Sequence, residues 1–432
     1  MRGRLGRAKQ LLAETVANRG WFAASIYLAR LLWRKTPYLV SNVVASRRTR
    51  QIRSSIDRSR REIPTETPYL ALAITGGLGD AIVIARFIRD LANAVGGIRF
   101  DVFSPTPSQA VWVFAHIPGF NAAYHDLAFD HVVAQYDLAM RLNQFVIVYK
   151  EAIRWDRIRS NHQLMAIVDN VIRFRANIES FVNVHPWLDN FLAQTAVFHG
   201  ATRRDFLHLM AKIRYSENRL ALPQDRSVLQ RLDLLPGSYV TVHNGFDPGF
   251  LISNQRATKC YPYFGSVVTM LKVAFPDLHF VQIGTVTSEP IPECDMVLVN
   301  KTNLDEVVAL IANSVLHLDN EGGLVHVSAA VGTQSVVVFG PTPANYFGYP
   351  ENINIEPPVC GNCWWMTRTW MDACAKRYDT PKCMTEQTPD IVATKARRAI
   401  EIYLAQPDTA KMDAPLSTSI AHTPEMAQTY AS

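Results

Sequence analysis

The sequence has few cysteines and no long apolar run, and each absence excludes a class of protein. Six cysteines among 432 residues are too few for a scaffold built on disulfides. The longest early apolar run, from Trp21 to Trp33, contains Arg30 and is shorter than the roughly 20 residues that cross a bilayer. No small-residue cleavage site follows in the usual place, which argues against a secretory signal peptide. A composition of 48% hydrophobic and 10% aromatic residues excludes a largely disordered chain and predicts two globular domains.

The net charge of most of the chain is small, and the excess of positive charge is concentrated at its start. The formal net charge is +6, yet residues 1–64 hold 15 basic and 3 acidic side chains and carry +12 by themselves. The remaining residues hold 29 basic and 35 acidic side chains and carry −6. A basic arm therefore precedes a mildly acidic body, and this distribution argues against a nucleic-acid partner.

The arm has the composition of a helix that lies on a membrane. Arginines bracket its Trp- and Leu-rich run on both sides, at Arg2, Arg4, Arg7, Arg34, Arg47, Arg48, Arg50 and Arg53. Such a helix can rest in the interface of an anionic bilayer. The alternative is a helical extension packed on the body, with its arginines in solvent. We expect the extension to span residues 1–66.

Strands and helices alternate from residue 69 onward. The run 69–75 predicts a buried strand, and apolar residues from Ile84 to Val95 at three- and four-residue spacing predict the helix that follows. Further strands are expected at 99–103, 136–142 and 145–149. This alternation predicts a parallel sheet with crossover helices. Residues 151–215 show no clean period, and we expect helices and loops there.

A second alternating set begins after Pro236-Gly237. Strands are expected at 239–243, 279–284, 296–300, 315–319 and 335–339. Helices are expected at 263–275, 304–311 and 324–331. Two such open sheets imply a cleft between them, which is the default ligand site. The tail, 405–432, is rich in Pro, Thr, Ser and Ala without periodicity and is expected to be disordered.

The first strand ends in a glycine turn at residues 76–80, Gly-Gly-Leu-Gly-Asp. Gly76, Gly77 and Gly79 would let the backbone approach a ligand, and free N–H groups at the helix start favour an anion or an oxygen-rich substrate. The turn lacks both the G-x-G-x-x-G spacing of dinucleotide sites and the Lys-Ser/Thr of a phosphate loop, which disfavours a dehydrogenase. Asp80 would stand at the helix N-terminus in the cleft. The alternative is that it only caps the helix.

The second half repeats this geometry at residues 320–326, Asn-Glu-Gly-Gly-Leu-Val-His. Glu321 could accept hydrogen bonds from ribose hydroxyls, and the N–H groups of Gly322 and Gly323 could face a diphosphate. The alternative is a glycine turn with Glu321 as a cap and His326 as a satisfied buried histidine. Thr258 and Lys259 precede another predicted helix, and a lysine at a helix start is best explained by an anion bound there.

Four of the six cysteines crowd one short segment, at Cys360, Cys363, Cys374 and Cys383. The C-x-x-C pair at its start can bring two thiolates to one tetrahedral metal ion, although the second pair is more widely spaced than in a zinc ribbon. A structural Zn or Fe site is one interpretation. Buried unpaired or partly disulfide-bonded thiols are the other.

Together these segments resemble glycosyltransferase family 9, the ADP-heptose:lipopolysaccharide heptosyltransferases. The resemblance rests on the turn at 76–80, Thr-Lys-Cys-Tyr-Pro at 258–262, the segment 321–333, Phe-Gly-Pro-Thr at 339–342 and the late cysteines, and it covers roughly residues 68–400. It implies a GT-B fold of two facing Rossmann-like domains, an acceptor domain at 67–235 and a nucleotide-sugar domain at 236–404. The basic helical extension and the Cys-rich insertion would be additions to that fold.

The resemblance also implies roles for particular residues. Asp80 matches the catalytic base, which takes the proton of an acceptor hydroxyl. Lys259, with Thr258, matches the residues that hold the donor diphosphate, and Gly322, Gly323 and His326 match the nucleotide-binding turn. Glu321 stands where the family usually has Asp and Gly322 where it has Thr, so the donor stays open between ADP-heptose and another nucleotide sugar.

The implied function is inverting transfer of a heptose-like sugar to a glycolipid of the cell surface, with no metal required for catalysis. Such an enzyme would be cytoplasmic and peripheral at the inner face of a bacterial inner membrane. The cysteines keep a second function open, transfer to an autotransporter-type protein, because some such relatives bind iron through four cysteines. A non-catalytic nucleotide-binding assembly protein on the same fold is a third.

Overall fold

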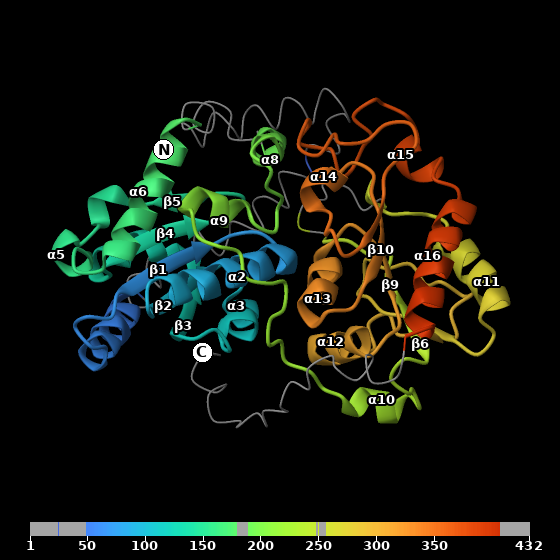
Figure 1. The fold of residues 1–432 in the computed structure, drawn as a ribbon, viewed down its shortest axis with the longest axis horizontal. Coiled ribbons are helices and arrows are strands. Elements are labelled where there is room, and N and C mark those ends of the chain that lie inside the picture. The colour runs from blue at the N-terminus through green and yellow to red at the C-terminus, as the bar shows by residue number, and fades with distance from the viewer. Residues whose placement is uncertain (1–24, 26–48, 179–188, 248, 250–255, 407–432) are drawn as a thin grey trace.

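The protein consists of two α/β halves that lie side by side, coloured from blue to green and from yellow-green to red in Figure 1. The structure is a computed structural model, and it describes residues 25, 49–178, 189–247, 249 and 256–406. The predicted α/β class with parallel sheets is confirmed. Apart from Ser25, the apolar run of the arm lies outside the described residues, and so does nearly all of the predicted tail.

The first half is built on a five-stranded sheet in the order β3-β2-β1-β4-β5. Its strands are β1 (Tyr69–Ile74), β2 (Arg99–Ser104), β3 (Phe120–His125), β4 (Leu138–Leu142) and β5 (Val146–Val148). Every residue of β1 is buried, as expected for a central strand with helices on both faces. The strand predicted at 145–149 departs from the expected parallel arrangement, since Val148 pairs antiparallel with Met140. The connection from β4 is a tight turn and is far too short for a crossover.

The helices of the first half include the segment that the sequence pattern left unassigned. They are α2 (Leu78–Ala94), α3 (Pro107–Phe114), α4 (Phe129–Val132), α5 (Trp155–Ile158), α6 (His162–Ala176), α8 (Asp189–Phe198) and α9 (Phe206–Ala211). The described residues within 151–215 therefore form helices and loops, as expected, and α6 packs on β5 and α9. After α9 the chain crosses to the second half through α10 (Ser227–Arg231).

The second half is built on a six-stranded sheet in the order β11-β10-β9-β6-β7-β8, with all neighbours parallel. Its strands are β6 (Tyr239–Val242), β7 (His279–Gln282), β8 (Met296–Val297), β9 (His317–Asn320), β10 (Ser335–Val338) and β11 (Ile353–Ile355). Read from the other edge, this is the order of a doubly wound nucleotide-binding sheet. Its helices are α11 (Phe264–Ala274), α12 (Leu304–Ala312), α13 (Gly323–Val331), α14 (Ala344–Phe347), α15 (Lys382–Thr385) and α16 (Pro389–Leu404).

Both sheets change winding direction at a point where the sequence analysis placed a glycine turn. In the first sheet the reversal lies between β1 and β4, and β1 leads into the turn at 76–80. In the second sheet it lies between β6 and β9, and β9 leads into the turn at 321–323. Ligands of doubly wound sheets bind outside the carboxyl ends of the strands at such points. The two turns are therefore placed where a ligand site is expected.

The two halves share part of one apolar core. Val325 and Ala329 of α13 belong to the same buried cluster as Leu70 of β1 and Ile84 of α2. Helices α2 and α13 pack against each other across the junction, and they face one another at the centre of Figure 1. The relative position of the two glycine turns is thus fixed by apolar packing between the halves.

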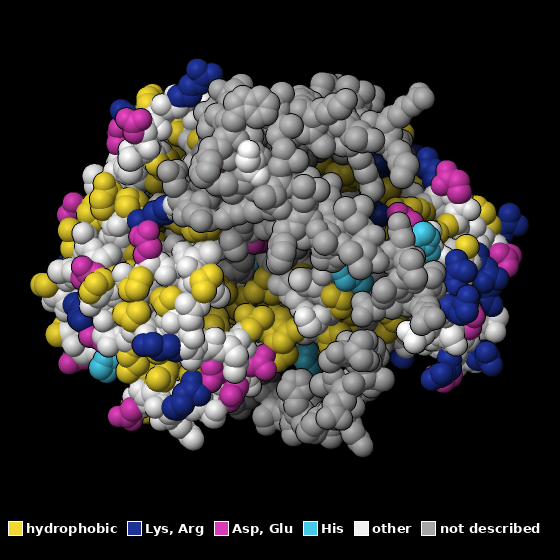
Figure 2. All heavy atoms as spheres, turned by 180° about the vertical axis from the view of Figure 1, so that it is seen from behind, with side chains coloured by type: hydrophobic (Ala, Val, Ile, Leu, Met, Phe, Trp, Pro, Cys, Tyr) yellow, Lys and Arg dark blue, Asp and Glu magenta, His cyan; other side chains and the backbone are white. Residues whose placement is uncertain are grey.

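A helix over residues 49–62 anchors the described end of the basic arm. Ile56 is fully buried against the first sheet, and the Arg60 Nη1 atom donates to Asp137 Oδ2 at 2.7 Å. Arg53 and Arg58 stay exposed, and Figure 2 shows basic side chains gathered at the outer edge of this half. In the described part of the chain, no helix combines the length and apolarity needed to span a bilayer.

Candidate active site

The two glycine turns meet where the N-termini of α2 and α13 pack together. A Cβ atom on Gly79 would lie 2.4 Å from Cδ2 of His326, so a side chain at position 79 would push the helices apart. A Cβ atom on Gly323 would lie 3.6 Å from the backbone N of Gly79, an ordinary contact distance. Gly76 adopts a φ of 111°, which other residues rarely take. The turns from the two halves therefore lie next to each other.

Asp80 is held at the start of α2 and keeps contact with solvent. Its Oδ2 atom accepts from the backbone N of Gly77 at 3.2 Å, which is the capping interaction anticipated from the sequence. Its Oδ1 atom accepts from Arg203 Nη2 at 2.7 Å and from Gln144 Nε2 at 3.4 Å. The side chain is 24% exposed. Capping thus uses one carboxylate oxygen, and the group remains accessible to solvent.

Arg203 and Gln144 were not identified in the sequence analysis. Arg203 lies in the loop between α8 and α9, and its side chain is 1% exposed. Burial acts to lower the pKa of its guanidinium, but the neighbouring Asp80 carboxylate raises the pKa overall. Gln144 lies between β4 and β5, and its Oε1 atom accepts a hydrogen bond from the Tyr346 hydroxyl at 2.8 Å. No local pattern distinguishes these residues, because their partners are brought together only by the fold.

Lys259 forms a buried ion pair with Glu321. The Lys259 Nζ atom lies 3.0 Å from Glu321 Oε2, and both side chains are largely buried. Burial acts to lower the pKa of the lysine, yet the Glu321 carboxylate raises it overall, so the ammonium group is charged. The structure therefore brings together two residues predicted for the donor site, one before α11 and one after β9.

Thr258 has a different environment from its neighbour. Its hydroxyl donates to the carbonyl of Trp370 at 2.7 Å, and its backbone N donates to the carbonyl of Met371 at 2.8 Å. The side chain is buried. Thr258 therefore fastens the Lys259 loop to the Cys-rich segment, and its hydroxyl is already used.

His326 is a buried neutral histidine at the junction of the halves. Burial lowers its pKa well below the usual value, and the positive charges of Arg86 and Arg203 lower it further. Its Nδ1 atom lies 2.7 Å from the hydroxyl of Tyr349, which accepts from Arg86 Nη1 at 2.5 Å. His326 thus agrees with the alternative given in the sequence analysis, a buried histidine whose ring is hydrogen-bonded. Its ring lies between the two glycine turns, against Gly79.

A second histidine lies at the carboxyl end of β6 and was not singled out in the sequence. His243 Nδ1 lies 2.8 Å from Asp319 Oδ1, and His317 Nε2 lies 3.3 Å from Asp319 Oδ2. Burial acts to raise the pKa of Asp319, but the two histidines lower it overall. A strand-end histidine oriented by a buried aspartate therefore stands beside the winding reversal of the second sheet.

The four clustered cysteines lie near one another in the fold. Burial raises the pKa of Cys363, and the thiols of Cys374 and Cys360 contribute. Burial and the thiols of Cys360, Cys363 and Cys374 raise the pKa of Cys383 to about 12. All four are free, and within the described ranges no three Cys, His, Asp or Glu side chains are placed to hold a metal ion. The predicted Zn or Fe site therefore finds no support in the arrangement of its ligands.

The aromatic residues between these cysteines pack into the fold. Trp364 and Trp370 are buried, and the Trp364 ring contacts Phe347 with centroids 4.9 Å apart. The Cys-rich segment is thus part of the core, and through Thr258 it supports the loop that presents Lys259.

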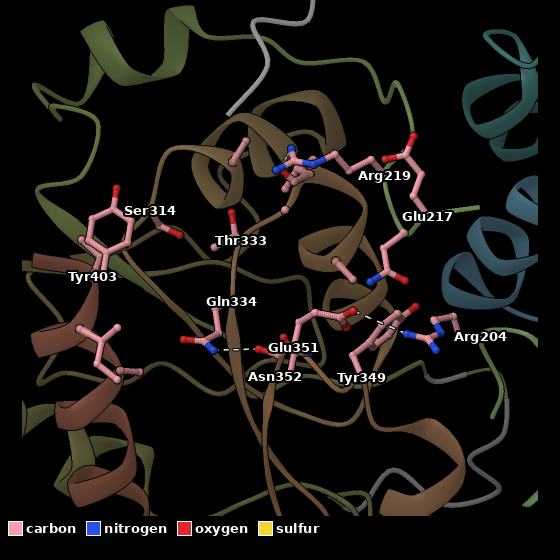
Figure 3. Close-up of a pocket in the computed structure, with 18 of the residues that line it drawn as sticks. Arg204, Glu217, Arg219, Ser314, Thr333, Gln334, Tyr349, Glu351, Asn352 and Tyr403 are labelled. Carbon is pink, nitrogen blue, oxygen red and sulfur yellow. Dashed lines mark hydrogen bonds and ion pairs between the residues drawn. The ribbon is translucent and has the colours of Figure 1, made fainter. Parts of the chain in front are cut away.

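A separate cavity of about 830 Å³ lies at the other end of α13 (Figure 3). Its walls include Gly332 and Gln334 of the second half and Glu217 and Arg219 of the segment that joins the halves. It contains none of the predicted site residues. Tyr349 lines it and links it through a hydroxyl to His326.

The sequence model of glycosyltransferase family 9 (heptosyltransferase) matches residues 285–364. Lipooligosaccharide heptosyltransferase 2 of Haemophilus influenzae is 38% identical over 65 residues, which are 15% of this chain and 19% of that protein. This chain thus spans about a fifth of its curated relative. The resemblance to family 9 predicted from the sequence segments is confirmed. The matched stretch includes the turn at 321–323 but neither Asp80 nor Lys259.

Solved structures give two further similarities over most of the chain. The structure of ADP-heptose lipopolysaccharide heptosyltransferase II of E. coli aligns with a TM-score of 0.46 at 15% identity. The alignment covers 78% of this chain and 100% of the E. coli chain. The iron-containing dodecameric glycosyltransferase TibC of enterotoxigenic E. coli has a TM-score of 0.49 at 15% identity and covers 79% of this chain and 80% of its own.

Proposed function

We propose that the chain is a glycosyltransferase of GT-B type that moves a sugar from a nucleoside diphosphate donor to a hydroxyl group of an acceptor. The observation that carries the proposal is the convergence of two glycine turns at facing winding reversals, with Asp80 on one and the Lys259–Glu321 pair beside the other. A carboxylate that is open to solvent and a buried ammonium group are the two charges that such a transfer requires.

The second half would bind the donor. The first turn of α13 offers N–H groups with the positive end of the helix dipole, and this arrangement favours a diphosphate. Lys259 would neutralise that diphosphate, exchanging part of its contact with Glu321 for the phosphate oxygens. Glu321 would then be free to accept hydrogen bonds from ribose hydroxyls. Thr258 would support the loop through its contact with Trp370 and would not touch the donor.

The transfer would be a single displacement. The acceptor oxygen attacks the anomeric carbon, a new carbon–oxygen bond forms, and the bond from that carbon to the diphosphate oxygen breaks. Asp80 takes the proton of the acceptor hydroxyl, and Lys259 with the α13 N–H groups stabilises the charge on the departing nucleoside diphosphate. A single attack from the opposite face inverts the anomeric configuration.

We propose a heptose-like sugar and a glycolipid acceptor at the cell surface. The curated relative is named for heptose transfer to lipooligosaccharide, and the basic arm suits an anionic membrane at which such an acceptor would be found. Transfer to a protein is the second candidate, because four cysteines gather in one segment as the resemblance implies for such enzymes. Radiolabelled sugar recovered in protein instead of in the lipid extract would favour that candidate.

The substitution Asp80→Asn tests the proposal. The variant should keep its donor affinity and lose transfer, with kcat lower by about 10²–10⁴-fold, because an amide cannot take the proton. Donor binding is measured as the rise in unfolding temperature with nucleoside diphosphates and their sugars, and transfer is measured with labelled donor. Glu306→Gln is the matched control, since Glu306 also caps a helix from its third position, at α12.

Four results would contradict the proposal in different ways. Near-normal turnover of the Asp80 variant removes the base assignment. Equal losses in both variants would trace the effect to helix capping. If no nucleotide raises the unfolding temperature of the unmodified chain, the transferase function itself is wrong, and nucleotide binding without transfer would favour the assembly protein.

A further inference from the structure

The two oxygens of the Asp80 carboxylate have unequal environments. Oδ1 accepts from Arg203 at Nη2, 2.7 Å, and at Nε, 3.3 Å, and also from the Gln144 side chain. Oδ2 accepts only from the backbone N of Gly77 among the contacts of the described residues. A carboxylate oxygen accepts about two hydrogen bonds. Oδ1 is therefore saturated, and Oδ2 keeps the free lone pair.

Both residues on Oδ1 are fastened to one tyrosine of the second half. The backbone N of Arg203 donates to the carbonyl of Tyr346 at 2.7 Å, and the Tyr346 hydroxyl donates to Gln144 Oε1 at 2.8 Å. Tyr346 lies in α14 and is fully buried. Asp80, Gln144 and Arg203 belong to the first half, so their arrangement depends on the packing of the two halves.

We propose that Arg203 is a positioning residue that holds the Asp80 carboxylate in one orientation. In that orientation Oδ2 is the oxygen that takes the acceptor proton. Tyr346 makes this arrangement depend on the packing of the second half against the first. The inference rests on the proposed function, because it requires Asp80 to act as a base. Arg203 touches neither donor nor acceptor in this scheme. Its effect passes through the orientation of one carboxylate.

This assignment explains a costly feature of the site. The guanidinium of Arg203 is buried and contacts only the Oδ1 atom of Asp80. Its Nη1 atom has no hydrogen-bond partner in the part of the chain that the structure describes. Unpaired buried donors are rare because they lose their hydration. The fork of an arginine holds a carboxylate in one orientation, whereas the ammonium group of a lysine acts as a point charge.

The test compares Arg203→Ala and Arg203→Lys with the matched control Arg204→Ala in the full-length chain. Arg204 is the next residue, but it pairs with Asp205 and Glu351 and not with Asp80. We expect kcat to fall about 10²-fold in Arg203→Ala and about tenfold in Arg203→Lys, with the donor KM within about threefold, because a displaced catalytic group costs rate and leaves donor binding intact. Arg204→Ala should keep the kcat of the unmodified chain.

Chemical rescue separates positioning from a structural role. Guanidinium chloride below its denaturing concentration should raise kcat of Arg203→Ala at least tenfold by filling the vacated space, and it should not raise kcat of Arg204→Ala.

Tyr346→Phe, which removes the hydroxyl that donates to Gln144, should lower kcat about three- to tenfold. If Arg203→Ala does not fold, as judged by its thermal unfolding, the test uses Arg203→Lys and its own predicted loss of kcat, about tenfold.

A double substitution distinguishes failure of this inference from failure of the proposed function. In an Asp80→Asn background, Arg203→Lys should cause no further loss, since both changes act on one step. A full additional loss, a loss confined to KM, or an unchanged kcat in Arg203→Ala overturns the positioning role while Asp80 remains the base. Near-normal transfer by the Asp80→Asn variant instead removes Asp80 as the base, which is the part of the proposed function on which this inference rests. An unmodified chain that no nucleotide stabilises overturns the transferase function itself.

Discussion

His326 is a neutral ring placed among cationic side chains. Arg86 donates to the Tyr349 hydroxyl, which leaves that hydroxyl's proton for His326 Nδ1, and a protonated ring could not accept it. The lowered pKa, caused first by burial and then by Arg86, Arg203 and Lys259, agrees with this contact. His326, which matches the nucleotide-binding turn in the sequence, therefore has a structural role, and the lowered pKa of its ring makes that role measurable.

We expect the protein to lose stability as the pH falls below about 6.5, the value at which an unfolded histidine takes up a proton. The folded ring stays neutral there, so the unfolded state binds more protons, and the free energy of unfolding decreases by at most about 1.4 kcal/mol per pH unit. Denaturant unfolding between pH 5 and 8 checks this slope. His326→Asn, whose amide oxygen can accept from Tyr349, should have a flatter slope, and an identical slope would contradict the assignment.

A second loss of stability should begin near pH 4 and should be retained in the His326 variant. Asp137 and Asp319 have lowered pKa values, since Arg60 and the two histidines respectively outweigh the effect of burial. A carboxylate with a lowered folded pKa stabilises the fold above its unfolded value near 3.9 and loses that contribution as the pH falls. The two losses are therefore separable by one substitution.

At the scale of elements, the site depends on how closely α2 and α13 approach. Gly79→Ala would place a methyl group 2.4 Å from the His326 ring, whereas Gly323→Ala, on the other side of the same contact, meets atoms no closer than 3.6 Å. We expect the Gly79 variant to lose about 1–3 kcal/mol of stability through overpacking, and the Gly323 variant to lose none. Calorimetric unfolding measures both. Equal unfolding temperatures would mean that the helices separate without cost.

At the scale of the whole molecule, charge is divided between an acidic body and a basic arm. The helix over 49–62 docks through Ile56 and Arg60, so it fixes where the arm leaves the first half. The residues before it carry most of the arm's positive charge. The predicted membrane helix at 21–33 lies in that part of the chain, and its role remains a prediction.

We expect the full-length chain to sediment with vesicles that contain anionic lipid at an ionic strength of about 0.1 M and to be released at about 1 M, where the Debye length falls from about 10 Å to about 3 Å. A variant without residues 1–48 keeps the docked helix and should stay in the supernatant. Neutral vesicles serve as the control for apolar binding. Equal sedimentation of both chains would place the membrane contact elsewhere or remove it.

The sequence by itself determined the local features of this protein. Residue patterns located most strands and helices, because buried strands and amphipathic helices carry their own periodicity. Glycine turns after β1 and β9, and a lysine before α11, were visible because each occupies a special position in its own segment. The antiparallel edge strand β5 follows from a short connection, but alternation alone did not indicate it.

Only the tertiary structure decided which groups act together. Arg203 reaches Asp80 across 123 positions and Tyr346 reaches Gln144 across 202, and neither pairing leaves a local signal. The fold also showed that the Thr258 hydroxyl donates to the Trp370 carbonyl, and among the described residues it showed no group of side chains placed to hold a metal ion. Sequence records the chemistry that each residue can offer. Which oxygen of Asp80 stays free depends on the packing of two halves, and that packing is a property of the folded chain.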